Sequence, residues 1–247
     1  MSMVDIYSHV FPLTAGPERF ENGVYRTIIT QVAGTAFSIG RGIFLTAAHV
    51  AHNTSEHQRR LGYVDKDKNL IGVLVQDAEV LDGLDIALLR VPELPAAPPF
   101  RWASHDLARL EQVFAAGYPF ALDNEAMVVS ARAFIGHVSG VRTFSKLALA
   151  PQVYELTFQC ARGLSGAPLC IWGKRPDVAG VVIGNQSTEM NVFTDREEIV
   201  EGTTTIVQRY EAMQLGVAVS STAILALHSK LLGTTIGAHL SAQGLVA

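Results

Sequence analysis

A proline-rich stretch, PELPAAPPF at residues 92–100, divides the chain into two parts of similar character. Proline has no backbone N–H to donate to a β-ladder, so four prolines within nine residues cannot belong to the interior of a sheet. We therefore expect this stretch to connect two folded units, residues 1–98 and residues 99–219. The remaining residues, 220–247, are expected to form a C-terminal segment.

Short strands with turn signals between them occur on both sides of the proline-rich stretch. A Gly-Arg-Gly turn at residues 40–42 separates two apolar runs, and a charged turn at residues 65–69 separates another two. Both patterns predict β-hairpins. Together they indicate an all-β fold of barrels or sandwiches. Further strands are expected over residues 24–32, 85–91, 111–117, 127–138, 152–159, 167–172, 178–184, 203–209 and 215–220.

Two segments near the C-terminus have a different character. Residues 220–232, SSTAILALHSKLL, combine serines that can cap a helix with leucines on one helical side, which predicts a C-terminal α-helix. Residues 185–202 carry several acidic side chains and are expected to form a loop that acts as a flap. After residue 211 the chain is almost uncharged, which suggests that this segment packs on the body or docks on a regulatory partner.

The overall composition narrows the functional classes. The 247 residues carry a net charge of −4 and 49% hydrophobic residues, which favours a compact globular protein and gives no basic field for nucleic acid. We find no signal peptide and no apolar run long enough for a membrane helix. The two cysteines and the histidine spacings match no disulfide scaffold or zinc pattern. We expect a cytoplasmic protein without metal, cofactor or membrane contact.

Three residue types that support nucleophilic catalysis occur at separate places. His49 is the second-last residue of the run GIFLTAAHV, where a strand leads into small residues. Asp85 directly precedes a buried strand and needs a partner, because an unpaired buried carboxylate is costly. Ser165 lies between Gly163 and Gly166 in ARGLSGAPLC, where glycines allow a tight turn with converging N–H groups. Taken singly, each residue also fits a purely structural role.

The order of these blocks resembles a known family. GTAFSIGRGIFLTAAHV, LDIALLRV and GLSGAPL resemble the three signature blocks of the trypsin-like (chymotrypsin-fold) serine peptidases. VFAAGYPFAL and LGVAVSSTAI resemble the bacterial Do/HtrA-type branch. The resemblance spans residues 24–230 and implies two six-stranded antiparallel β-barrels, with the active site in the cleft and a C-terminal α-helix. His49 and Asp85 would lie on the first barrel and Ser165 on the second.

The resemblance also implies roles for neighbouring residues. Ser165 would be the nucleophile, His49 the base and Asp85 the residue that orients it. The N–H groups of Gly163 and Ser165 would form the oxyanion hole. The backbone at Ile183, Gly184 and Asn185 would bind the substrate as an added strand, and Gln159 would lie at the base of the primary specificity pocket.

Three departures from the family pattern surround the serine. Leu164 stands where digestive relatives carry an aspartate that pairs with a newly cut N-terminus, so activation by that route is not expected. Ala167 replaces a glycine, and Arg162 has no assigned role, although it could regulate the oxyanion loop.

Three functions remain open at this stage. The first is a serine endopeptidase that acts on a protein or peptide substrate. The second is a catalytically inactive or latent pseudo-protease that binds peptides. The third is a regulated protease of a bacterial signalling, defence or quality-control system. The Do/HtrA branch usually carries PDZ modules, and the residues after 230 are too few for one.

Overall fold

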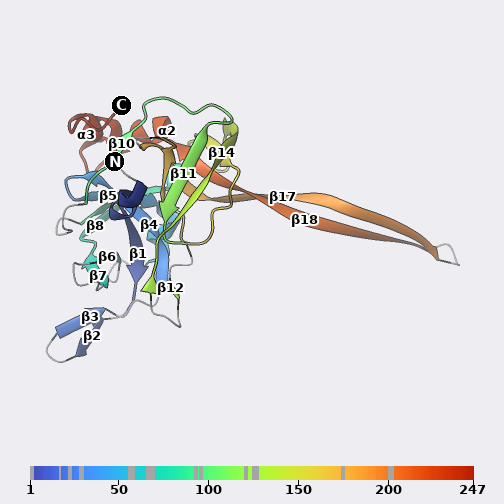
Figure 1. Cartoon of the computed structure of the whole chain (residues 1–247), viewed down its shortest axis with the longest axis horizontal. Coiled ribbons are helices and arrows are strands. Elements are labelled where there is room, and N and C mark those ends of the chain that lie inside the picture. Colours follow the sequence, from blue (N-terminus) through green and yellow to red (C-terminus); the bar gives the residue numbers. More distant parts are fainter. Residues whose placement is uncertain are drawn as a thin grey trace.

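Two curved β-sheets form most of the body of the computed structural model (Figure 1). The structure describes residues 3–16, 18–21, 24–27, 31–54, 59–64, 70–91, 94, 97–119, 122–123, 128–173, 176–199 and 203–247. Four of the six residues 91–96, including two of the prolines, lie outside these ranges. The division into residues 1–98, 99–219 and 220–247 stays a prediction, although the strands of the first sheet all lie within 10–90 and those of the second within 101–220.

The first sheet has seven strands in the order β7-β6-β1-β4-β5-β9-β8, and neighbouring strands are antiparallel. The hairpins predicted around residues 40–42 and 65–69 are confirmed by the pairings of β4 with β5 and of β6 with β7, whereas the turn residues 65–69 lie outside the described ranges. Glycines at 40 and 42 and Arg41 between them all have positive φ, which explains the Gly-Arg-Gly turn. The strands are β1 (Val10–Ala15), β4 (Gln31–Gly40), β5 (Ile43–Ala47), β6 (Arg60–Val64), β7 (Leu70–Leu74), β8 (Asp77–Leu81) and β9 (Ile86–Arg90).

The second sheet closes on itself. Its order is β10-β17-β16-β11-β14-β15-β18, and pairing of β17 with β18 completes a six-stranded barrel to which β10 adds in parallel. With the half-barrel of the first sheet, this gives the double-barrel, chymotrypsin-like architecture that the sequence predicts. The strands are β10 (Arg101–Trp102), β11 (Gln112–Gly117), β14 (Arg132–Thr143), β15 (Gln152–Leu156), β16 (Pro168–Ile171), β17 (Asp177–Ile199) and β18 (Thr203–Ser220).

Short elements connect and cover the two sheets. Two-stranded pairs join β2 with β3, β12 with β13 and β19 with β20. Their bounds are β2 (Glu18–Glu21), β3 (Val24–Thr27), β12 (Leu122–Asp123), β13 (Val128–Val129), β19 (His228–Ser229) and β20 (Thr234–Thr235). The helices are η1 (Met3–Ser8), α1 (Ala48–His52), η2 (Asp82–Leu84), α2 (Ser221–Leu225) and α3 (Ile236–Ser241).

One continuous apolar core joins the two sheets. Phe37 of β4 packs against Trp102 of β10 with ring centroids 5.9 Å apart, and both side chains are fully buried. Phe114 of β11 belongs to the same cluster. Because side chains from both sheets share this core, the relative placement of the two barrels is fixed by apolar packing.

The loop predicted at residues 185–202 is wrong for residues 185–199, and residues 200–202 lie outside the described ranges. Residues up to Ile199 continue β17, which pairs with β18 as far as Ile199 opposite Thr203. In Figure 1 the two strands leave the body as one long arm. The sequence rule that acidic residues mark a loop fails here, because both strands of the arm supply each other's backbone hydrogen bonds whatever their side chains are.

The C-terminal segment packs on the body. Helix α2 begins at the predicted Ser220 cap, whose hydroxyl accepts a bond from Ala223 N–H, but it ends at Leu225, earlier than expected. Farther on, the chain end pairs with β10: Trp102 N–H donates to Leu245 O, and Ala247 N–H to Trp102 O. The apolar character of this segment is therefore used within the molecule, and its docking on a partner stays a prediction.

Both cysteines are free and buried. Burial raises the pKa of Cys160 to about 12 and raises that of Cys170 still further, so both remain protonated thiols around neutral pH. Among the described residues, no group of acidic, histidine or cysteine side chains is arranged to hold a metal ion. No described helix has the length and hydropathy of a membrane span.

Candidate active site

His49 and Asp85 form a close pair at the edge of the first barrel. The Nδ1 atom of His49 lies 2.8 Å from Asp85 Oδ2, and the backbone N–H of His49 donates to Asp85 Oδ1 at 2.9 Å. The side chains are 42% and 18% exposed, so the carboxylate is more sheltered than the ring. A carboxylate on Nδ1 favours the tautomer with the proton there, which leaves Nε2 free to accept a proton.

The local fold brings the pair together. His49 is the second residue of α1, which follows β5 without a break, and Asp85 follows η2 at the start of β9. Strands β5 and β9 are paired, with Ala47 opposite Ile86. Asp85 has a left-handed backbone with φ of 57°, and its carbonyl accepts a bond from Ala48 N–H. A non-glycine residue rarely adopts this conformation, and here it turns the carboxylate toward α1.

A second histidine–aspartate pair lies on the same two elements. His52 Nε2 is 3.0 Å from Asp82 Oδ1, and these side chains are 57% and 75% exposed. Exposed pairs of this kind contribute little to stability. Because the His52–Asp82 pair lies next to the His49–Asp85 pair, it provides an internal control for mutagenesis.

The Ser165 loop is held by a tight backbone path. Gly163 and Gly166 have φ of +100° and +85°. A Cβ at Gly163 would lie 2.4 Å from Tyr118 O, and one at Gly166 would lie 2.1 Å from Thr35 O. Both positions therefore need glycine for conformation and for space. Ser165 itself is half-buried.

Thr35 of β4 joins this loop to the first barrel. Its hydroxyl donates to Gly163 O at 2.8 Å and accepts from Tyr118 N–H at 2.9 Å. Its own N–H donates to Ser165 O at 2.9 Å, while Thr46 Oγ1 donates to its carbonyl at 2.7 Å. Thr35 is fully buried, so the loop that carries the serine is fixed against the barrel that carries His49.

The backbone around Ser165 leaves two N–H groups available. Leu164 N–H bonds to Ala161 O, Gly166 N–H to Val182 O, and Ala167 N–H to Leu164 O. Within the described part of the chain, the N–H groups of Gly163 and Ser165 donate to no protein acceptor. These are the two donors expected for an oxyanion hole, and they suit stabilisation of a developing negative oxygen.

The three departures from the family pattern take different positions. Leu164 is fully buried in the apolar core of the second barrel, in contact with a cluster that includes Ala103 and Val113. Packing, not an ion pair, therefore holds the loop at this point. Ala167 is buried in the same cluster, and Arg162 is exposed.

No hydrogen bond joins Ser165 to His49 among the described residues. Contacts between a nucleophile and its base are often long in a structure without substrate and shorten in the complex. The structure therefore pairs His49 with Asp85 and fixes the Ser165 loop beside them, and the final link between serine and base stays a prediction.

The predicted substrate-binding residues lie on two segments that face each other. Ile183, Gly184 and Asn185 belong to β17, where Gly184 has a φ of +144° and open space around its Cα. The Asn185 side chain accepts from Cys160 N–H at 2.7 Å and donates to Cys160 O at 2.8 Å. Gln159, next to Cys160, is exposed, and its place in a specificity pocket stays a prediction.

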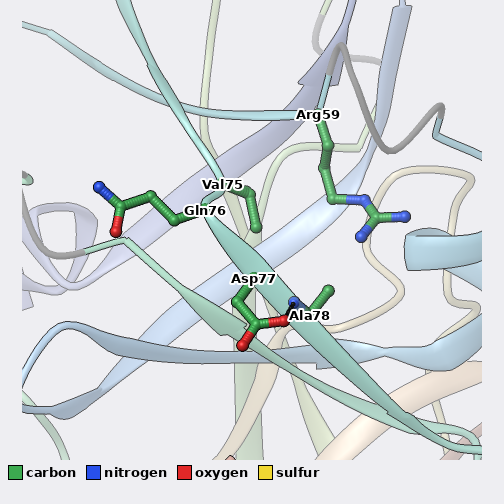
Figure 2. Close-up of a pocket in the computed structure, with 5 residues that line it drawn as sticks. All are labelled: Arg59, Val75, Gln76, Asp77 and Ala78. Carbon is green, nitrogen blue, oxygen red and sulfur yellow. Dashed lines mark hydrogen bonds between the residues drawn. The ribbon is translucent and has the colours of Figure 1, made fainter.

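Arg59 binds the C-terminal end of α1, the helix that carries His49. Its guanidinium donates to Ala51 O at 2.6 Å and to Thr54 O at 3.2 Å, at the C-terminal end of α1. A cation is favourable at that end of a helix. Arg59 also lines an open pocket of about 150 Å³ together with Val75, Gln76, Asp77 and Ala78. Figure 2 shows these five side chains. This pocket is separate from the histidine–aspartate pair.

Sequence reasoning missed Thr35, Thr46 and Arg59 as supports of the site. The two threonines stand among apolar residues of buried strands, and a hydroxyl in such a strand needs a hydrogen-bond partner. That signal could have marked them. No such sequence signal marks Arg59, because the neighbouring Arg60 and the polar loop before it resemble a solvated surface.

Comparison with known proteins agrees with this geometry. The sequence matches the family model of the trypsin-like peptidase domain over residues 34–181. No curated protein matches the sequence significantly. The structure resembles the MamO protease domain of Magnetospirillum magneticum in its apo form, with a TM-score of 0.59 and 16% identity over 90% of this chain and 97% of that one.

Two further solved structures share the fold. One is an inactive serine-to-alanine mutant of Rv3671c from M. tuberculosis H37Rv, with a TM-score of 0.54 and 17% identity over 98% of this chain and 90% of that one. The other is the HtrA-type protease AlgW with a tripeptide, with a TM-score of 0.54 and 16% identity over 90% of this chain and 61% of that one. At these identities the likeness concerns the fold.

Proposed function

Since the chain belongs to the family of trypsin-like peptidase domains, we propose that it is a serine endopeptidase that forms an acyl-enzyme on Ser165. Its substrate is a protein or peptide chain. The observation that carries the proposal is the double contact of Asp85 with His49, on the ring Nδ1 and on the backbone N–H. A carboxylate in this position orients the imidazole as a base.

The reaction follows from the roles of the three residues. His49 Nε2 accepts the proton of Ser165 Oγ, which attacks the carbonyl carbon of the scissile bond. The N–H groups of Gly163 and Ser165 stabilise the oxyanion, and each such donor contributes about 3–4 kcal/mol. His49 then gives its proton to the leaving amine. Water, activated by the same base, releases the acyl group and restores Ser165.

A second candidate is a peptide-binding protein without turnover. The absence of a hydrogen bond between Ser165 and His49 among the described residues favours this candidate. The close His49–Asp85 pair favours the enzyme, because a binding module has no need of an oriented base. The two functions predict different results with variants of the aspartate.

We expect the wild-type protein to cleave unfolded casein and Asp85→Asn to lower kcat by roughly 10⁴-fold, because the amide no longer holds the required imidazole tautomer. The control is Asp82→Asn in the neighbouring exposed pair, which should change kcat less than about twofold. Initial rates with labelled casein measure both. Equal losses in the two variants, or no cleavage by the wild type, would contradict the endopeptidase proposal.

A further inference from the structure

The family resemblance already implies that the substrate backbone lies along Ile183–Asn185; we propose that this binding edge continues along the outer edge of β17 to Asn191 and so extends the active site along the arm. An extended polypeptide segment on the N-terminal side of the scissile bond would pair with it as a third strand. This inference rests on the proposed endopeptidase function. It adds the kind of substrate that the protein takes, a chain with a long extended segment before the cleaved bond.

The edge is unpaired where the arm leaves the barrel. Pairing of β17 with β16 ends at Val181 opposite Pro168, whereas pairing with β18 continues to Ile199. In the described part of the chain, no strand covers the other edge of β17 beyond Val181. Alternate residues there present backbone N–H and C=O groups, which act as a template for another strand.

The edge starts at the nucleophile. Gly166 N–H donates to Val182 O at 2.8 Å, and Val182 N–H donates to Ala167 O at 3.0 Å, so β17 passes directly beside the Ser165 loop. A peptide with its scissile carbonyl at Ser165, in antiparallel pairing with β17, runs outward toward its own N-terminus. The residues before the cleaved bond therefore follow the arm (Figure 1).

The beginning of the edge is held in place. The Asn185 side chain forms two hydrogen bonds with the backbone of Cys160. Arg142 of β14 donates to Gln186 Oε1 and also, at 2.6 Å, to Glu155 of β15. These contacts fix the base of the arm to the barrel, so an added strand would meet a preformed edge.

The sequence of the edge permits pairing over a defined length. Natural edge strands are usually blocked by lysine or proline, and residues 183–191, IGNQSTEMN, contain neither. The pairing of β17 with β18 has one register shift between Val182 and Gly184, at the start of the edge, and another between Asn191 and Phe193, at its far end, and each marks a bulge. At about 3.3 Å per residue, the usable edge is about 30 Å long.

The chemistry of the edge defines the substrate class. Backbone pairing reads the extended conformation and tolerates many side chains. A two-stranded ribbon is marginal in isolation, and a third strand stabilises it. An unfolded or terminal segment of a protein can supply that strand, whereas a short peptide or a folded surface loop cannot.

The test compares peptides of different length before the cleaved bond. A site mapped in unfolded casein is synthesised with three or with ten residues on its N-terminal side. We expect wild-type kcat/KM to be roughly tenfold higher for the longer peptide. Affinity for Ser165→Ala, measured by fluorescence polarisation with the same peptides, should show the same preference.

Two variants with a shortened arm distinguish the contribution of the edge from that of the rest of the hairpin. Replacing residues 188–213 with Asn-Gly joins the paired Ser187 and Gln214 by a two-residue turn and removes most of the edge. This variant should cleave the short peptide normally and lose the length preference. Replacing residues 194–208 joins the paired Phe193 and Arg209, keeps the edge, and should keep the preference.

Each result decides between the alternatives. A preference that survives the 188–213 replacement, or its absence in the wild type, overturns the substrate edge. A dimer that dissociates in that variant, without a length preference in the wild type, shows that the edge pairs two copies instead. If no form cleaves either peptide, the endopeptidase proposal fails together with this inference. A further experiment uses only the wild-type protein. Each backbone N–H before the scissile bond of the longer peptide is methylated in turn. We expect the cleavage rate to fall only for methylation at alternate positions, where the N–H would bond to the edge of β17.

Discussion

Gly163 contributes to the site through its backbone alone. Its φ of +100° and the 2.4 Å approach of Tyr118 O to an added Cβ exclude any other residue without local rearrangement. Its carbonyl is held by the Thr35 hydroxyl, which orients the peptide group that precedes Leu164. The geometry of the oxyanion donors therefore depends on this one conformation.

We expect Gly163→Ala to lower kcat/KM by roughly 10²–10³-fold, the effect of losing one oxyanion donor, because the added methyl forces the loop away from Tyr118. Gly173→Ala is the matched control, since a Cβ there meets no atom within 4 Å and the residue is exposed. Hydrolysis of a peptide ester substrate measures both. Full activity of Gly163→Ala would show that the N–H of Gly163 is not needed.

At the same scale, sequence reasoning identified His49, Asp85 and Ser165 as candidates, and the structure pairs the first two. A hydroxyl in a buried strand could have marked Thr35, but the partners of that hydroxyl, Gly163 and Tyr118, could not be predicted because both are more than 80 residues away. A hydrogen bond between the two barrels depends on how the barrels pack, and the local periodicity of the sequence does not predict this packing. The hydrogen bonds of the Asn185 side chain with Cys160 lie within the second barrel, and local periodicity does not predict them either.

At the level of elements, Glu79 of β8 is one of the residues that attach the C-terminal segment to the first sheet, together with Arg90, which donates to Leu231 O. Glu79 Oε2 accepts from Ser229 Oγ at 2.5 Å and from Leu231 N–H at 2.8 Å, while Oε1 accepts from Lys230 N–H at 2.8 Å. Burial raises the pKa of Glu79, but these bonds and the Lys230 charge together hold it below its ordinary value.

The pKa of Glu79 is lower in the folded protein than its ordinary value of 4.5. The ionised carboxylate therefore stabilises the fold fully at a pH above 4.5, and this stabilisation is lost as the pH falls through the pKa of the folded state. We expect Glu79→Gln to lower Tm at pH 7 by roughly 2–4 °C, for a loss of about 1 kcal/mol after allowance for solvent screening. The difference from wild type should shrink below pH 4.5. Thermal denaturation between pH 3 and pH 7 measures it.

The control for this experiment is Asp77→Asn on the same strand, where Asp77 is exposed and accepts a bond from the neighbouring Ala78 N–H. It should leave Tm nearly unchanged. A Tm difference for Glu79→Gln that stays constant across the pH range would show that the charge of the carboxylate does not contribute.

The elements themselves show where local patterns succeed. The hairpin at residues 40–42 was predictable, because a Gly-Arg-Gly turn between apolar runs has a local conformational cause. Helix α2 was predicted to run to residue 232, yet it ends at Leu225. The later leucines pack against the core, where tertiary contacts outweigh helical periodicity.

At the scale of the whole molecule, two barrels with a shared core place the His49–Asp85 pair beside the Ser165 loop. The sequence predicted the double-barrel fold because turn signals act locally, whereas the division at the proline-rich stretch stays a prediction. It did not predict the arm, since a long hairpin of mixed polar and apolar residues has no clear alternation. Its strands are defined by their pairing with each other, from Val217 opposite Gly184 to Thr203 opposite Ile199.

The central claim is that Ser165 is a nucleophile activated by His49. The most direct measurement is labelling of the folded protein with a fluorophosphonate probe, followed by mass spectrometry of the labelled peptide. We expect one label per chain on Ser165 and none in Ser165→Ala, because only a serine activated by a neighbouring base reacts with the probe. Labelling that persists in Ser165→Ala, or an unlabelled wild-type protein at pH 8, would contradict it.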